Sequence, residues 1–283
     1  MLKFRLIFGS LMLAVLFGLL YLDGKLSEAM VFDGAVFTAL VSLLAIPAQF
    51  EMRALAAKKG LEVMLFPAIA GSIILASAFF WPQFVKPEVQ SDFLITYITF
   101  TPALIVCAVF FEQAMRRGYE STIANCSATI LSIMYLGLMS SFIVGLRIKM
   151  GLAALLFAII TLKSSDIGAY TFGRIFGKRK FSPTISPGKS WEGLLGGAVF
   201  AAVIGFWLAG YVDFLPRWGG AVFGAVFAVI GQLGDLAESM LKRDAGVKDS
   251  ANYIPGFGGI LDIIDSPLIA APFAYLYLSM FLN

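Results

Sequence analysis

The chain has 283 residues, of which 59% are hydrophobic and only 14% are charged, whereas about a quarter of a soluble domain's residues are charged. This composition excludes an ordinary soluble domain, and the net charge of +3 is too small to indicate a nucleic-acid partner. Because the chain has no histidine, His-based zinc sites and histidine acid–base chemistry are excluded, and two cysteines make neither a disulfide framework nor a Cys/His metal site.

The hydrophobic residues fall into blocks of roughly 20 residues, the length of a bilayer-spanning helix. Continuous apolar runs indicate helices, because a helix satisfies its own backbone in lipid. We therefore predict an all-α, polytopic integral membrane helix bundle. Nine spans are predicted, at residues 4–22, 31–50, 63–81, 93–111, 122–145, 151–172, 194–214, 219–238 and 266–282. The first is not expected to be a signal peptide, because no small-residue cleavage pattern follows it.

The distribution of positive charge predicts the orientation. With nine spans and a cytoplasmic N-terminus, fifteen of the 21 Lys and Arg residues fall inside, five fall outside and Lys163 lies within a span. This asymmetry agrees with the positive-inside rule. We predict a bacterial-type inner (plasma) membrane protein whose polar segments face the cytoplasm, where basic loops suit anionic headgroups or a phosphate ligand.

Composition divides the chain near residue 120. Residues 1–120 are expected to be N-terminal membrane helices joined by short loops, and charges there, such as Glu51, are expected to be solvated or to face headgroups. Residues 121–283 are expected to form C-terminal membrane helices with a catalytic site on the cytoplasmic side. The polar residues become dense from Lys163 onward.

The first polar cluster lies around Asp166, late in a predicted span, where an unpaired carboxylate is costly. Two interpretations stay open. Asp166 pairs with Lys163 and stabilises the bundle, or it faces a polar cavity and helps to bind a metal or ligand.

The second cluster contains Ser186 and the Gly188-Lys189-Ser190 tripeptide. It is not a P-loop, because Pro183 stands in place of the first glycine and no strand precedes it. It is either a turn that presents Lys189 and helix N–H groups to an anion, or an ordinary turn in which Ser190 caps the helix.

The third cluster follows the eighth span. If the helix continues, Asp235, Ser239 and Lys242 share one stripe with Gln232. Metal ligation is the favoured role for Asp235. The pair of Glu238 with Lys242, taken alone, could be a routine surface ion pair.

The fourth cluster is a glycine-rich turn at 255–259, followed by two aspartates. Asp262 and Asp265 share a face at a spacing of three. Ser266 and Pro267 are predicted to begin the last helix, so Asp265 could instead stabilise its first turn.

Together these clusters resemble the phosphatidate cytidylyltransferase (CDP-diacylglycerol synthase) family over roughly residues 163–267. The matching C-terminal signature is Ser239-x-x-Lys242-Arg243-x-x-x-x-Lys248-Asp249, then Pro255-Gly-x-Gly-Gly-x-x-Asp262-x-x-Asp265. The similar upstream elements are Asp166-x-x-Ala-Tyr, Gly173-Arg-x-Phe-Gly-Lys, Ser186-Pro-x-Lys189 and Trp191-Glu-Gly. Two positions depart from the family: Phe257 stands where His is common, and Ile263 where Arg is common.

The resemblance implies that CTP and phosphatidate react to give CDP-diacylglycerol and pyrophosphate. It also implies that Asp235 and Asp262 hold Mg²⁺, with a second cation such as K⁺ left open. We add Asp166, Asp249 and Asp265 as supporting or second-metal carboxylates. Lys242 and Asp265 complete the expected catalytic set. The expected binding residues are Ser186, Lys189, Ser239, Arg243, Lys248 and Asp249.

Alternative functions remain at this stage. A CTP-dependent lipid kinase, or a cytidylyltransferase for another lipid, would use similar groups. A transporter is disfavoured, because no inverted repeat is visible and the ionisable residues gather near the C-terminus. Loss of activity also stays open because of Phe257 and Ile263. The expected partners are the two substrates and the bilayer, without nucleic acid, and a homodimer remains an alternative to a monomer.

Overall fold

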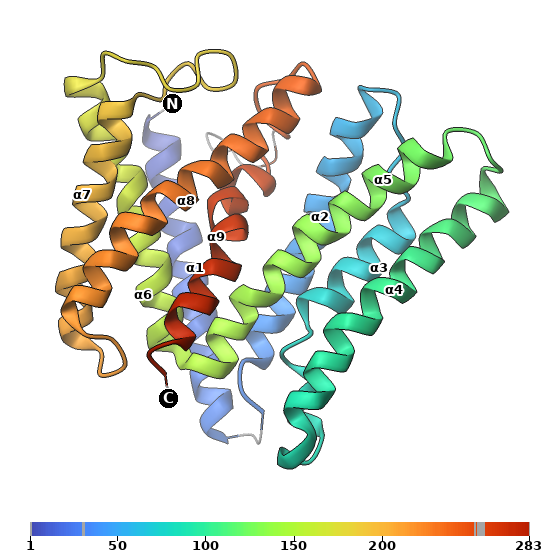
Figure 1. Cartoon of the computed structure of the whole chain (residues 1–283), viewed down its shortest axis with the longest axis horizontal. Helices are drawn as coiled ribbons and strands as arrows, with labels where there is room; N and C mark the ends of the chain where they lie inside the picture. The colour runs from blue at the N-terminus through green and yellow to red at the C-terminus, as the bar shows by residue number, and fades with distance from the viewer. Residues whose placement is uncertain (1, 30–31, 252, 254–257, 283) are drawn as a thin grey trace. The chain divides into compact units, whose positions relative to one another are not determined.

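The computed structural model describes residues 2–29, 32–251, 253 and 258–282 (Figure 1). Their regular structure is helical apart from isolated bridge positions, among them the pair Lys180 and Ser190. The predicted all-α, polytopic membrane class is confirmed. The described residues form nine α-helices, namely α1 Leu2–Ala29, α2 Ala35–Ala57, α3 Leu65–Ala76, α4 Gln90–Arg116, α5 Thr122–Ile133, α6 Met139–Phe176, α7 Trp191–Leu208, α8 Arg217–Asp244 and α9 Leu261–Ser279.

The predicted count of nine spans is not confirmed. Within the described residues, seven helical stretches are long and apolar enough to cross a membrane. Residues 122–176 form one helical stretch of 55 residues, which contains two of the predicted spans and breaks at Gly151, where φ is 84° and ψ is 173°. A glycine accommodates that backbone because it has no Cβ.

The third predicted span is a short helix. Helix α3 has 12 residues, a length of about 18 Å, against a hydrocarbon core of about 30 Å. It ends at Ala76, and the short 3₁₀ turns Trp81–Phe84 and Pro87–Val89 follow, each with a proline at its start. Proline has no N–H to donate to an earlier carbonyl, so Pro82 and Pro87 do not continue an α-helix through the rest of the apolar run.

The chain divides into two compact units. Unit 1 comprises residues 1–149 and 244–263, and unit 2 comprises residues 150–243 and 264–283. The division near residue 120, drawn from composition, remains a prediction about where the polar chemistry begins.

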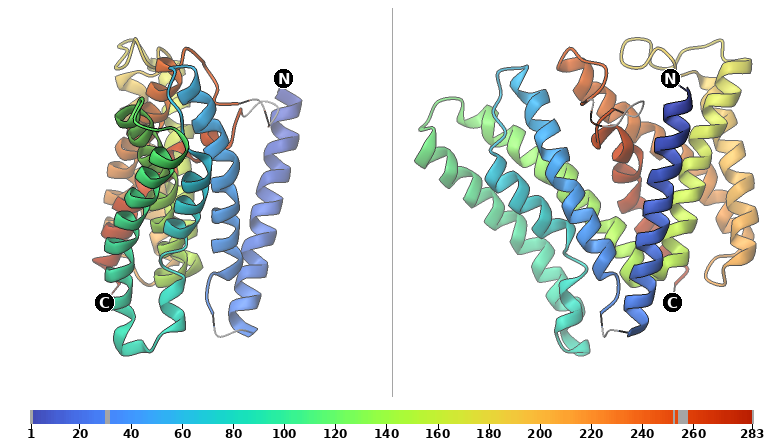
Figure 2. Two further views of the ribbon diagram at one scale, coloured as in Figure 1. Left: turned by 90° about the vertical axis from the view of Figure 1, so that its right-hand side faces the viewer. Right: turned by 180° about the vertical axis from the view of Figure 1, so that it is seen from behind.

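Unit 1 is built around α3, which contacts α2, α4 and α5 (Figure 2). Its core contains buried Met64, Leu75, Val109 and Ile133. A buried ion pair joins Arg147 Nε to Asp23 Oδ2 at 2.7 Å, and Asp23 Oδ1 also accepts a hydrogen bond from the Phe37 N–H. The opposite charge and the Phe37 N–H offset part of the cost of burying the Asp23 carboxylate.

Unit 2 packs its helices closely through glycines. A Cβ built on Gly197 of α7 would lie 2.8 Å from the carbonyl oxygen of Ser165 in α6. A Cβ on Gly234 of α8 would lie 3.0 Å from the carbonyl oxygen of Asp265 in α9. Small residues let helix backbones approach one another in a membrane. Gly234 therefore brings α8 against the part of α9 that carries Asp265.

Candidate active site

An acidic cluster of three carboxylates lies in unit 2. Asp235 and Glu238 of α8 and Asp265 of α9 each offer an oxygen, and these oxygens lie within 4.8 Å of one another. Glu238 and Asp265 are buried. The spacing of three residues places Asp235 and Glu238 on one side of α8, and the close approach at Gly234 brings Asp265 to them.

Two lysines partly compensate the charge of this acidic cluster. Lys189 Nζ lies 2.7 Å from Asp235 Oδ2, and Lys242 forms an ion pair with Glu238. The Ser239 hydroxyl donates to Asp235 Oδ1 at 3.2 Å. Three carboxylates face two ammonium groups, so the cluster retains a net negative charge that favours a cation.

The Glu238–Lys242 pair is not a surface pair. The Glu238 side chain is 0% exposed and that of Lys242 is 11% exposed. In a buried pair each charge depends on its partner, because desolvation makes an isolated ion costly. The routine-surface interpretation of this pair is therefore wrong.

Lys189 reaches Asp235 from the 177–190 loop, which joins α6 to α7. Ser190 caps α7, because its hydroxyl accepts a hydrogen bond from the Gly193 N–H at 3.1 Å. The predicted helix cap by Ser190 therefore forms. The same turn also places Lys189 beside the acidic cluster. The Ser186 carbonyl accepts a hydrogen bond from the Lys189 N–H, and Arg243 Nε donates to the Ile185 carbonyl at 3.1 Å.

Asp166 pairs with Lys163 at 3.5 Å, and both side chains are partly exposed. This contact is the Asp166–Lys163 pair that one of the two sequence interpretations predicted. Asp166 also interacts electrostatically with Asp235 and Lys189, so it contributes to the charge around the acidic cluster. Its role as a metal ligand remains a prediction.

Asp262 lies in unit 1, in the first turn of α9. Its Oδ2 accepts hydrogen bonds from the Ser250 N–H at 3.0 Å, the Ser250 hydroxyl at 2.7 Å and the Gly259 N–H at 2.8 Å. Lys248 and Asp249 belong to the same unit and are exposed. The metal role of Asp262 remains a prediction.

The start of the last helix was predicted wrongly. Helix α9 begins at Leu261, and Pro267 lies inside it. The Ser266 N–H donates to Asp265 Oδ1 at 2.6 Å. Asp265 is therefore not a residue of the turn before the helix, but a buried side chain of α9. Of the two departures from the family pattern, Ile263 lies in α9, and Phe257 lies outside the described residues.

Two acidic residues of the polar network were not among the predicted site residues. Glu238 completes the acidic cluster, and its spacing from Asp235 could have indicated it. Glu51, expected to be solvated or to face headgroups, is 1% exposed and bonds to residues about 200 positions later. No local pattern reveals a contact at that separation.

The acidic cluster suits a divalent cation. Its ligand atoms are carboxylate oxygens, the hard ligands that Mg²⁺ prefers. Two of the three residues, Glu238 and Asp265, are buried. Asp235, Glu238 and Asp265 are the residues of unit 2 that would hold the ion.

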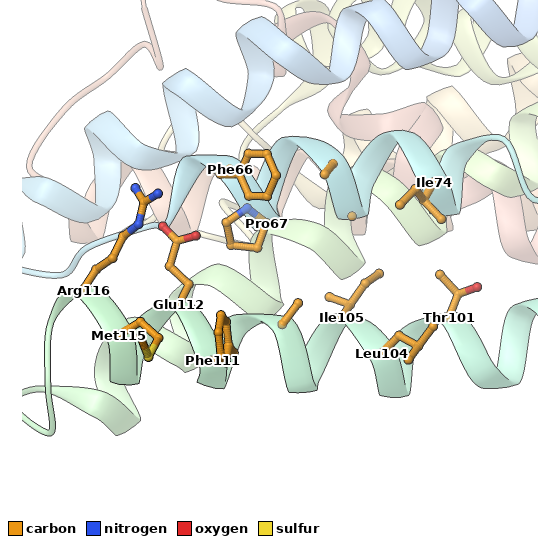
Figure 3. A pocket seen from close by; sticks show the side chains of 13 residues that line it. Phe66, Pro67, Ile74, Thr101, Leu104, Ile105, Phe111, Glu112, Met115 and Arg116 are labelled. Carbon is orange, nitrogen blue, oxygen red and sulfur yellow. The ribbon is translucent and has the colours of Figure 1, made fainter.

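A separate cavity of about 440 Å³ lies between α3 and α4 in unit 1 (Figure 3). Phe66, Ile74, Leu104 and Phe111 line most of it, and Glu112 and Arg116 lie at one end. Its lining is too apolar to satisfy the phosphates of a nucleotide. None of the predicted site residues lines this cavity.

Comparisons with known proteins give matches along the whole chain. The chain is 33% identical over 284 residues to a phosphatidate cytidylyltransferase of Bacillus subtilis, covering 99% of this chain and 98% of the relative. It is 32% identical over 311 residues to a phosphatidate cytidylyltransferase of Synechocystis, covering 98% and 97%. A phosphatidate cytidylyltransferase of Haemophilus influenzae is 47% identical over 133 residues, which is 45% of this chain and 46% of the relative.

The family comparison covers nearly every residue. The match to the family described as "Cytidylyltransferase family" runs from residue 3 to residue 281. It includes both units and every predicted site residue. The resemblance drawn from the polar clusters is confirmed, and the chain belongs to the cytidylyltransferase family.

Proposed function

We propose that this chain is a phosphatidate cytidylyltransferase of a bacterial inner membrane, with its site on the cytoplasmic side. A phosphate oxygen of phosphatidate attacks the α-phosphorus of CTP. The bond from the α-phosphorus to the bridging oxygen breaks, pyrophosphate leaves, and CDP-diacylglycerol forms. The full-length likeness to relatives of that name supports this activity.

The residues of unit 2 supply charge and positioning. Asp235, Glu238 and Asp265 hold a divalent cation, and Ser239 orients Asp235. When bound, the cation neutralises phosphate charge in the transition state. The attacking phosphate is already an anion at neutral pH, so a strong general base is unnecessary.

The cationic residues suit the phosphates of both substrates. Lys189 lies beside the acidic cluster, and Arg243 is exposed and bonded to the same 177–190 loop. A lysine paired with a carboxylate can exchange that partner for a phosphate oxygen, because both are oxygen anions. We assign Ser186, Lys189, Lys242, Arg243 and Lys248 to phosphate binding, and Asp166, Asp249 and Asp262 to supporting or metal-binding roles.

The acidic cluster beside Lys189 is the observation that carries this proposal. The test incubates the purified, folded protein with radiolabelled CTP, phosphatidate and Mg²⁺. We expect label in the lipid together with release of pyrophosphate. Release of CDP without labelled nucleotide in the lipid would indicate a kinase. Absence of turnover with each of several divalent metals would contradict the proposal.

A further inference from the structure

Glu51 is a buried carboxylate in α2 of unit 1. It is 1% exposed, at a position where an unpaired charge would be costly. Its described donors all come from residues 250–261, which lie in the same unit but roughly 200 positions later in the chain. A side chain placed in this way joins two distant segments.

Two of these donors are backbone groups at the start of α9. The Ile260 N–H donates to Glu51 Oε1 at 2.7 Å, and the Leu261 N–H donates to Glu51 Oε2 at 3.0 Å. The first N–H groups of a helix lack partners within the helix, and negative charge is favourable beside them. Glu51 therefore caps α9 from another helix.

The third donor couples Glu51 to Asp262. The Ser250 hydroxyl oxygen lies 2.7 Å from Glu51 Oε2 and 2.7 Å from Asp262 Oδ2. A hydroxyl carries one hydrogen, so Ser250 donates to one carboxylate at a time. Asp262 also accepts the N–H groups of Ser250 and Gly259. The segment that Glu51 anchors is thus the segment that holds Asp262.

Gly259 permits this arrangement. A Cβ at this position would overlap Glu51 Oε2 and the Ser250 hydroxyl. No larger residue fits without moving one of these oxygens. The glycine therefore lets the Glu51 carboxylate and the Ser250 hydroxyl lie close to the backbone.

We propose that Glu51 is a positioning residue: by anchoring the start of α9 and Ser250, it sets the place of the Asp262 carboxylate. Its consequence for the reaction rests on the proposed function, in which Asp262 is assigned a supporting or metal-binding role. The anchoring of the segment does not depend on that function.

The experiment compares full-length wild type with Glu51→Gln. Hydrogen exchange is measured at the amides of Gly259, Ile260 and Leu261, and CTP turnover is measured across a Mg²⁺ titration. We expect about tenfold faster exchange at Ile260 and Leu261, because their N–H groups lose charge-assisted hydrogen bonds to Glu51. Exchange at Gly259, whose N–H donates to Asp262, should also rise, because the segment is no longer anchored. We also expect about a tenfold higher Mg²⁺ concentration for half-maximal rate, as for other partners of metal ligands.

Asp23→Asn is the matched control, because Asp23 is an equally buried carboxylate of unit 1 that bonds elsewhere. It is expected to lower stability while leaving exchange at 259–261 and the Mg²⁺ requirement unchanged. A lower rate in Glu51→Gln with the wild-type Mg²⁺ requirement would overturn the positioning role, since loss of folded protein alone gives that result. Equal shifts in the control would also overturn it.

Ser250→Ala keeps the proposal falsifiable if Glu51→Gln does not fold. This variant removes only the shared hydroxyl, so we expect smaller shifts of both measurements in the same direction. Wild-type values of both in Ser250→Ala would overturn the coupling. If wild type turns over no CTP, the proposed function fails, and the exchange measurement still decides whether Glu51 anchors the segment.

Discussion

Two pairs of carboxylates, one pair in each unit, have different kinds of partner. In unit 1, Glu51 and Asp262 accept backbone N–H groups and a serine hydroxyl. In unit 2, Asp235 and Glu238 pair with lysine side chains. Backbone donors are fixed by the fold, whereas a lysine can turn to another partner.

This difference separates two tasks that the same residue type can perform. Carboxylates held by backbone N–H groups determine the path of the chain, because moving them breaks helix caps and turns. Carboxylates held by lysines form a charged site whose partners can exchange when phosphate and metal bind. The comparison predicts that neutral substitutions at Glu51 and Asp262 act first on local order and through it on the metal requirement, whereas those at Asp235 and Glu238 act on the chemistry directly.

The largest effect is expected at the acidic cluster. Asp235→Asn or Asp265→Asn should lower CTP turnover by more than about 100-fold, because each removes a charged carboxylate that we propose as a metal ligand. Asp213→Asn is the control, because Asp213 is an exposed carboxylate of unit 2 outside the cluster. Radiolabelled CTP incorporation gives the rates. Near-wild-type turnover in both cluster variants would break the assignment of unit 2 to chemistry.

A second effect concerns the stability of unit 2. Glu238→Gln removes the charge beside buried Lys242 and should cost about 3–5 kcal/mol, as for other broken buried pairs. Lys163→Met, at the partly exposed pair with Asp166, should cost less than about 1 kcal/mol. Denaturant unfolding in detergent measures both.

A double variant sharpens this second prediction. Glu238→Gln with Lys242→Met removes both charges, so it should regain most of the lost stability while turnover stays low. If Glu238→Gln alone were as stable as wild type, the buried pair would not be a stabilising contact. If the double variant were active, neither residue would belong to the site.

Sequence predicts the helices and much of unit 2 for clear physical reasons. Apolar runs of bilayer length identify the spans, and a carboxylate beside an apolar span is costly enough to indicate function. Asp235 and Asp265 satisfy that criterion in unit 2. The break at Gly151 and the early end of α3 are harder to predict, since hydropathy does not report backbone angles.

The network of unit 1 lies beyond local patterns. Glu51 looks like an ordinary polar residue near a helix end, and only the return of residues 250–261 to α2 gives it donors. Glu238 and Lys242 show the same limit, because their spacing predicts the pair but not its burial. A pattern identifies neighbours on one helix, whereas burial depends on which other helices pack there.

The smallest expected effect is at a partly exposed ion pair, and it tests whether exposure to solvent weakens an ion pair. Glu62 lies in the connection between α2 and α3, and its side chain is 42% exposed. Its Oε1 lies 2.6 Å from Arg117 Nη2. Hydrogen bonding to Arg117 lowers the pKa of Glu62 below its ordinary 4.5. Its contribution to stability is therefore present above about pH 4.5 and is lost as the pH falls through the lowered pKa.

Glu62→Gln should consequently be less stable than wild type at pH 7, by less than about 1 kcal/mol because the pair is partly exposed. The two proteins should approach equal stability once Glu62 is protonated in the folded state. Thermal unfolding between pH 3 and pH 7 measures the difference. A gap that stayed constant across this range would contradict an ionic origin, because only the charged form of Glu62 pairs with Arg117. A gap as large as that of Glu238→Gln would show that exposure does not weaken these contacts.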